Sequence, residues 1–191
     1  MLLVQGPTFS GKTALAQKLA NHMNYAYLDL SVSTWWDANL PGKKTPESKV
    51  DVLMKFISSS RHRNIVLDGF PSNKHEAKIF FEHFCEPLKM VYLHLDKDEV
   101  HNRMAENLTK EEILVKRQEF ETYLLTKNDL VEYCQKLPFY QNISGLESED
   151  KVFNEAIGSL NPKVLLAHVN ENPELAETLM PRIENELGYI H

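Results

Sequence analysis

The chain has 191 residues, 42% of them hydrophobic and 25% charged, which indicates one domain with a packed core and argues against wholesale disorder. Its formal net charge of −6 argues against a general nucleic-acid or anionic-membrane binder, which needs a basic surface. The two cysteines, Cys85 and Cys134, lack metal-type spacing, which argues against a disulfide scaffold or zinc module and favours a reducing, cytoplasmic location. No apolar run is long enough for a membrane span, and the first residues lack a secretory signal pattern, so we expect neither.

The first predicted elements are a short buried strand at residues 1–4 and a helix at residues 13–23, in which apolar residues recur at helical spacing. Between them lies the sequence Gly6-Pro7-Thr8-Phe9-Ser10-Gly11-Lys12-Thr13, which matches the phosphate-loop pattern G-x-x-x-x-G-K-[ST]. A strand before this motif and a helix after it are the context that the motif requires. The sequence therefore predicts a phosphate-binding loop.

The residues of this loop suit the phosphates of a nucleotide. Gly6 and Gly11 have no Cβ, so the backbone can curl around an anion and point successive N–H groups at its oxygens. Lys12 is expected to bridge the β- and γ-phosphates, and Thr13 to offer its hydroxyl to Mg²⁺. We therefore predict that Gly6, Ser10, Gly11, Lys12 and Thr13 bind ATP, with Mg²⁺ at Thr13.

The rest of the chain alternates between predicted strands and helices. Strands are predicted at residues 25–30, 64–68, 90–95 and 139–143, and helices at 46–57, 74–84, 97–105, 109–136 and 150–160. Residues 31–45 show no clear periodicity and contain the turn signal Pro41-Gly42. The alternation predicts an α/β fold with a parallel five-stranded sheet flanked by helices. Ligands of such sheets bind beyond the carboxyl ends of the strands, where the loop, Asp29 and Asp68 fall.

Residues 1–160 resemble the adenylate kinase and nucleoside-monophosphate kinase family. Besides the phosphate loop, Leu67-Asp68-Gly69-Phe70-Pro71 followed by Glu76-Ala77 resembles the family signature L-D-G-F-P-R-x-x-x-Q-A. Residues 91–104 and 111–123 are similar to the segments on either side of the family's lid. The resemblance implies a P-loop NTPase fold and phosphoryl transfer from Mg·ATP to a nucleoside monophosphate.

The resemblance also implies roles for individual residues. Lys12 would hold the donor phosphates, while Thr13 and Asp68 would organise the metal, Asp68 through a water molecule. Arg103 would face the adenine and Arg117 the phosphates, so Lys12, Arg103 and Arg117 are the predicted catalytic residues. The alternative for Asp68 is a strand-end carboxylate that only caps the next turn.

Several positions depart from the family pattern. Ser72 stands where the signature has Arg, Glu76 where it has the Gln that reads the acceptor base, and residues 30–35 contain no acceptor-side Arg. Residues 105–109 predict a short lid without its arginines, and the monophosphate-binding subdomain is reduced. Trp35-Trp36 in that subdomain is either a stacking platform for a base or a hydrophobic cover.

These departures leave more than one function open. The first is a nucleoside-monophosphate kinase; the second is a weakly active or inactive nucleotide-binding module, with protein partners or further domains of a larger assembly. A P-loop kinase for a small metabolite is a third possibility, against which the Asp-Gly-Phe-Pro element argues.

Residues 161–191 form a predicted tail after the breaker Asn161-Pro162. Leu179, Ile183 and Leu187 repeat the spacing of the apolar residues in the helix at 13–23. We expect the tail to be the start of a second, degenerate kinase-like repeat; a chance amphipathic helix is the alternative.

Overall fold

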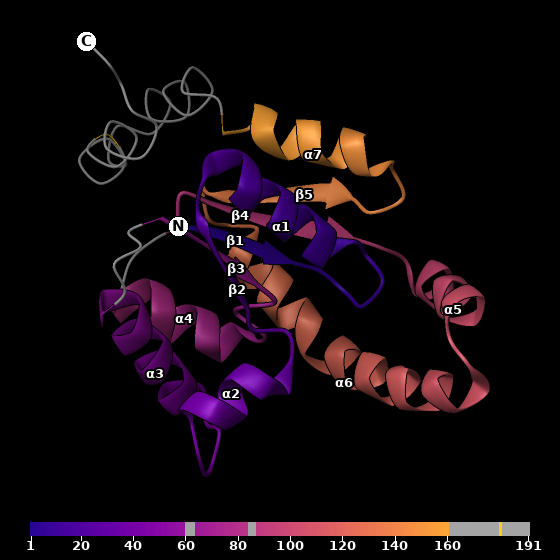
Figure 1. Cartoon of the computed structure of the whole chain (residues 1–191), viewed down its shortest axis with the longest axis horizontal. Coiled ribbons are helices and arrows are strands. Elements are labelled where there is room, and N and C mark those ends of the chain that lie inside the picture. Colours follow the sequence, from indigo (N-terminus) through magenta and orange to yellow (C-terminus); the bar gives the residue numbers. More distant parts are fainter. Residues whose placement is uncertain (60–63, 84–86, 161–179, 181–191) are drawn as a thin grey trace.

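Five parallel strands form the central layer of the computed structural model, which describes residues 1–59, 64–83, 87–160 and 180 (Figure 1). The strands are β1 (Leu2–Gln5), β2 (Ala26–Asp29), β3 (Ile65–Asp68), β4 (Lys89–His94) and β5 (Tyr140–Ser144). They lie in the order β2-β3-β1-β4-β5, and every neighbouring pair is parallel. The predicted α/β class and parallel five-stranded sheet are confirmed.

Different helices cover the two faces of the sheet (Figure 1). One face packs against α1 (Lys12–Met23) and α7 (Glu149–Gly158); the other packs against α3 (Pro46–Ser59), α4 (Lys74–His83) and the second half of α6 (Lys110–Cys134). In β1, Leu2 and Val4 enter the first core and Leu3 enters the second. Because both faces are buried, this strand is a continuous apolar run, as the sequence predicts.

The helix α5 (Lys97–Asn107) and the first half of α6 lie beyond the carboxyl ends of the strands (Figure 1). Together they bury a small core of their own around Val100, Met104 and Phe120. Only two residues separate the helices, which confirms the short connection predicted there. Thr109 begins α6 with the predicted capping box, in which its N–H donates to Glu112 Oε2 at 2.9 Å.

Residues 31–45 differ from the prediction because they contain a seven-residue helix, α2 (Ser33–Asn39). Its anchor is Trp36, which is 6% exposed and donates its indole N–H to Leu30 O at 3.0 Å. Trp35 packs edge-to-face on Phe56 of α3, at 5.5 Å between ring centroids. The tryptophan pair therefore packs as a hydrophobic cover on α3 and the core.

The predicted tail repeat falls on residues 161–191, which lie outside the described residues except for Met180, so it stays a prediction. None of the helices in the described ranges combines the length and the apolar character that crossing a membrane requires.

Candidate functional site

The phosphate loop connects the carboxyl end of β1 to the first turn of α1, at the edge of the sheet where the sequence predicts the ligand. Gly6 has a φ of 154°, and a Cβ on it would lie 2.7 Å from Leu93 O. Gly11 caps α1 in the left-handed conformation, with a φ of 86°. Both glycines are therefore required by the backbone, and the free N–H groups of the α1 N-terminus lie next to the loop.

Gln5 fixes this loop to the chain that follows β3. Its side-chain amide donates to Pro71 O at 2.5 Å, and its Oε1 accepts from Gly6 N–H at 3.0 Å. Gly69, between these segments, has a φ of 77°, and a Cβ there would lie 2.6 Å from Ser31 Cβ. The Asp-Gly-Phe-Pro element thus brings the ends of β1, β2 and β3 into direct contact.

Lys12 is half-buried at this edge, close to two carboxylates. Burial lowers the pKa of its ammonium group, and the nearby Asp68 and Asp29 carboxylates partly oppose that fall. A partly desolvated cation is prepared for an anion, since a bound phosphate would replace the hydration that burial removes. The structure thus places Lys12 where a phosphate-binding lysine is expected.

Asp68 ends β3 beneath the loop and is fully buried. Burial raises the pKa of its carboxyl, while the Thr13 hydroxyl, the Lys12 ammonium and the Tyr27 hydroxyl oppose the rise. Tyr27 donates to Asp68 Oδ2 at 3.0 Å, whereas Oδ1 has no well-formed hydrogen bond within the described ranges. The sequence did predict Thr13 and Asp68 together, but gave no signal for Tyr27.

This corner suits a hard divalent cation that is completed by nucleotide oxygens. The Thr13 hydroxyl lies beside the Asp68 carboxylate, and one buried oxygen of that carboxylate has no well-formed hydrogen bond within the described ranges. Mg²⁺ prefers oxygen ligands of this kind. No group of three or more His, Cys, Asp or Glu side chains in the described part of the chain forms a cage for a metal. Any Mg²⁺ here would therefore depend on phosphate and water ligands as well as on Thr13 and Asp68.

Two cavities flank the loop. The first, about 190 Å³, lies between the loop and α6 and is lined by Gln5, Gly6, Thr8, Lys12, Ser31, Gly69, Ser72, Glu119, Phe120 and Tyr123. The second, about 140 Å³, lies on the α7 side, and its lining includes Ser10, Gly11, Leu15, Lys18, Arg103 and Gly145. A ligand with phosphates on the loop can therefore extend into either cavity.

Arg103 lies at the second cavity, on the side that the resemblance assigns to the base. Its guanidinium donates to Phe9 O and to Gly145 O, each at 3.0 Å, and pairs with Glu99 at 2.7 Å. These bonds hold the phosphate loop against the turn after β5. In the structure Arg103 therefore supports the loop.

Arg117 is exposed on α6 and does not line either cavity. The α6 residues that line the first cavity are Glu119, Phe120 and Tyr123. Lys116, one residue before Arg117, pairs with Glu119 at 2.7 Å. Arg117 is thus not among the lining residues, whereas the first cavity is lined by Glu119, the ion-pair partner of Lys116.

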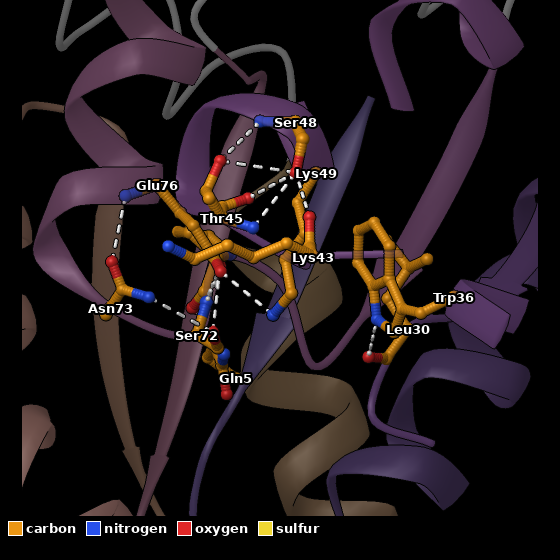
Figure 2. A network of polar contacts seen from close by, with 11 residues as sticks. Gln5, Leu30, Trp36, Lys43, Thr45, Ser48, Lys49, Ser72, Asn73 and Glu76 are labelled. Carbon is orange, nitrogen blue, oxygen red and sulfur yellow. Dashed lines mark hydrogen bonds and ion pairs between the residues drawn. The ribbon is translucent and has the colours of Figure 1, made fainter. Parts of the chain in front are cut away.

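A second network surrounds the buried carboxylate of Glu76 and reaches the first cavity through Ser72 (Figure 2). Glu76 is 1% exposed; Lys49 Nζ lies 3.1 Å from its Oε1, and the Ser72 N–H and hydroxyl both donate to its Oε2 at 2.8 Å. The same ammonium lies 5.1 Å from the centroid of a Trp36 ring. The two positions that depart from the kinase signature, Ser72 and Glu76, are therefore bonded to each other.

A family model described as an AAA domain matches residues 2–124, which include the loop, Lys12 and Asp68. The chain belongs to this AAA-domain family. A segment of 113 residues is also 26% identical to an adenylate kinase from Rickettsia bellii (strain RML369-C), over 51% of this chain and 53% of that protein. The chain thus spans about half the length of this curated relative. The comparisons support an adenylate-kinase-like P-loop member of the AAA-domain family, with a nucleotide-binding, kinase-like domain.

Proposed function

We propose that the chain binds Mg·ATP on its phosphate loop and transfers the γ-phosphoryl group to a nucleoside monophosphate. The observation that carries this proposal is the convergence of Lys12, Thr13 and Asp68 at one edge of the sheet, directly beside a cavity. The likeness to an adenylate kinase supports the same chemistry.

The donor nucleotide would lie with its phosphates on the loop and its base toward the cavity that Arg103 borders. Lys12 and the N–H groups of the loop would bind the β- and γ-phosphates and stabilise charge as it shifts to the leaving oxygen. Thr13 and Asp68 would hold Mg²⁺, which when bound supplies charge neutralisation between the phosphates. Arg103 donates to Phe9 O in the loop and to Gly145 O, and these bonds would hold the loop in position for the phosphates.

The acceptor would occupy the first cavity, between Ser31, Gly69 and Ser72 and the loop. An oxygen of its phosphate would form a bond to the γ-phosphorus while the bond to the β–γ bridging oxygen breaks, leaving ADP. The protein's contribution is alignment and exclusion of water, because this transfer needs little covalent chemistry from side chains.

A second candidate function is a nucleotide-binding module with little or no transfer activity. The observation that favours it is the Lys49–Glu76–Ser72 network, in which the carboxylate and its neighbouring lysine are already paired within the protein. In this case ATP binding would stabilise the domain without an acceptor.

A coupled assay of ADP formation with AMP, CMP, UMP and GMP separates the two candidates. The first predicts that one or more of these acceptors raises ADP formation well above that of a Lys12→Ala variant. The second predicts ATP binding with no acceptor-dependent turnover, and that result would contradict the first.

Asp68→Asn is expected to weaken the affinity for Mg²⁺ about 10–100-fold, and so to raise the Mg²⁺ concentration that ATP binding requires, because a residue that orients the metal through water has effects of this size. The measurement is the Mg²⁺ concentration that gives half-maximal ATP binding. Asp51→Asn, on the exposed surface of α3, is the matched control. An unchanged Mg²⁺ midpoint in Asp68→Asn would remove Asp68 from the metal site and favour its role as a turn cap.

A further inference from the structure

One face of helix α6 is directed at the phosphate loop, and Arg117 is not on it. Glu119, Phe120 and Tyr123 line the cavity that contains Lys12, and Lys116 pairs with Glu119. Lys116 precedes Glu119, Phe120 and Tyr123 by three, four and seven residues, so it lies near the middle of the helix face that they form. Arg117 is one residue out of phase with Lys116, about 100° around the helix, and is exposed.

The rotation of α6 about its axis is fixed by buried contacts. Phe120 is 2% exposed and packs in the small core with Val100 and Met104. Tyr123, one turn later, shares a hydrogen bond of 2.7 Å with the hydroxyl of Tyr92 on β4. Because both anchors belong to the cavity face, turning Arg117 toward the loop would require breaking them.

The charged residues near the loop bear on how this face of α6 could contact a phosphate. Among the described residues that line the first cavity, Lys12 is the only cation and Glu119 the only carboxylate. Burial is the main cause of the lowered pKa of Lys12, and the nearby Lys116 ammonium lowers it further. Two ammonium groups that are close enough to repel each other are both stabilised when a polyphosphate binds near them.

We propose that Lys116 is a second phosphate-binding cation, which contacts the terminal phosphates of the bound nucleotide from α6 while Lys12 contacts them from the loop. An ammonium has three N–H donors, so Lys116 can keep one bond to Glu119 while it donates to a phosphate oxygen. Glu119 balances the charge of Lys116, and both side chains are about half exposed. The proposal rests on the proposed nucleotide binding, and it assigns to Lys116 the role that the family resemblance implies for Arg117.

Three α6 variants test the proposal on the full chain: Lys116→Gln, Arg117→Gln and, as a control, Lys110→Gln at the exposed start of the helix. Dissociation constants are measured for Mg·ATP, Mg·ADP and AMP. Lys116→Gln is expected to weaken ATP binding about tenfold and AMP binding less than about twofold, because the lost contact is to the terminal phosphates. Arg117→Gln is expected to have a smaller effect on ATP, and Lys116→Arg to restore most of the affinity.

The pattern over the ligands separates phosphate binding from a structural effect. If Lys116→Gln weakens AMP as much as ATP, or if Arg117→Gln has the larger effect on ATP, the proposal for Lys116 is wrong. Absence of ATP binding by the wild-type chain would overturn both this proposal and the proposed function. Normal ATP binding that Lys116→Gln leaves unchanged would overturn this proposal alone.

Discussion

Lys12→Ala is expected to reduce phosphoryl transfer about 10²–10³-fold, the loss typical of removing one preorganised group that stabilises transition-state charge. The structure gives the physical reason, because Lys12 is half-buried at the loop and burial already lowers the pKa of its ammonium group. A bound polyphosphate compensates that burial, and alanine cannot. The measurement is ADP formation at saturating Mg·ATP with the best acceptor of the panel.

The control for this variant is Lys55→Ala, an exposed lysine on α3 that pairs with Asp51 at the surface. It is expected to retain wild-type activity. Thermal unfolding of both variants shows whether the fold is kept. If Lys12→Ala is folded and retains wild-type activity, the phosphate loop is not the site of the reaction.

Lys49→Met is expected to lower the free energy of unfolding by about 3 kcal/mol, because it leaves the Glu76 carboxylate buried without its cation. Glu76 is 1% exposed, so water cannot replace the lost partner. A loss of this size corresponds to a fall in melting temperature on the order of 6–12 °C for a chain of this length. The effect is measured by chemical denaturation and by thermal unfolding.

The double variant Lys49→Met/Glu76→Gln separates the buried charge from the packing of Lys49. It is expected to recover most of the lost stability, since the neutral amide can still accept from Ser72 and carries no charge. Lys55→Met, which breaks an exposed pair on the same helix, is expected to cost less than about 1 kcal/mol. A double variant that is no more stable than Lys49→Met would show that the ion pair is not the source of the stability.

The regular elements were predictable because each is specified locally. The apolar runs of β1 and β3, the glycines of the phosphate loop and the capping box at Thr109 all depend on residues within a few positions. The meeting of Thr13 and Asp68 also followed, because the carboxyl ends of parallel strands share one edge of the sheet.

Other features depend on contacts between distant residues. Helix α2 has no amphipathic period, and Trp36 anchors it through the core and Leu30 O. The Lys49–Glu76 pair joins α3 to α4 through two residues that are 27 positions apart. Neither pairing has a signal in the local sequence.

The rotation of α6 about its axis also depends on contacts between distant residues. Apolar residues occur on its exposed surface as well as its buried face: Leu114 is 70% exposed and Leu125 is 83% exposed. Periodicity therefore could not decide whether Lys116 or Arg117 faces the loop. The decision comes from Phe120 and Tyr123, whose partners lie on α5 and β4.

Isothermal titration calorimetry of the full chain with Mg·ATP tests the central claim, nucleotide binding by the phosphate loop, most directly. We predict a saturable heat of association with about one nucleotide per chain, strongly reduced in Lys12→Ala, as expected when a charged hydrogen bond is lost. No heat of association with the folded wild-type chain at several temperatures, or equal binding by Lys12→Ala, would contradict the account.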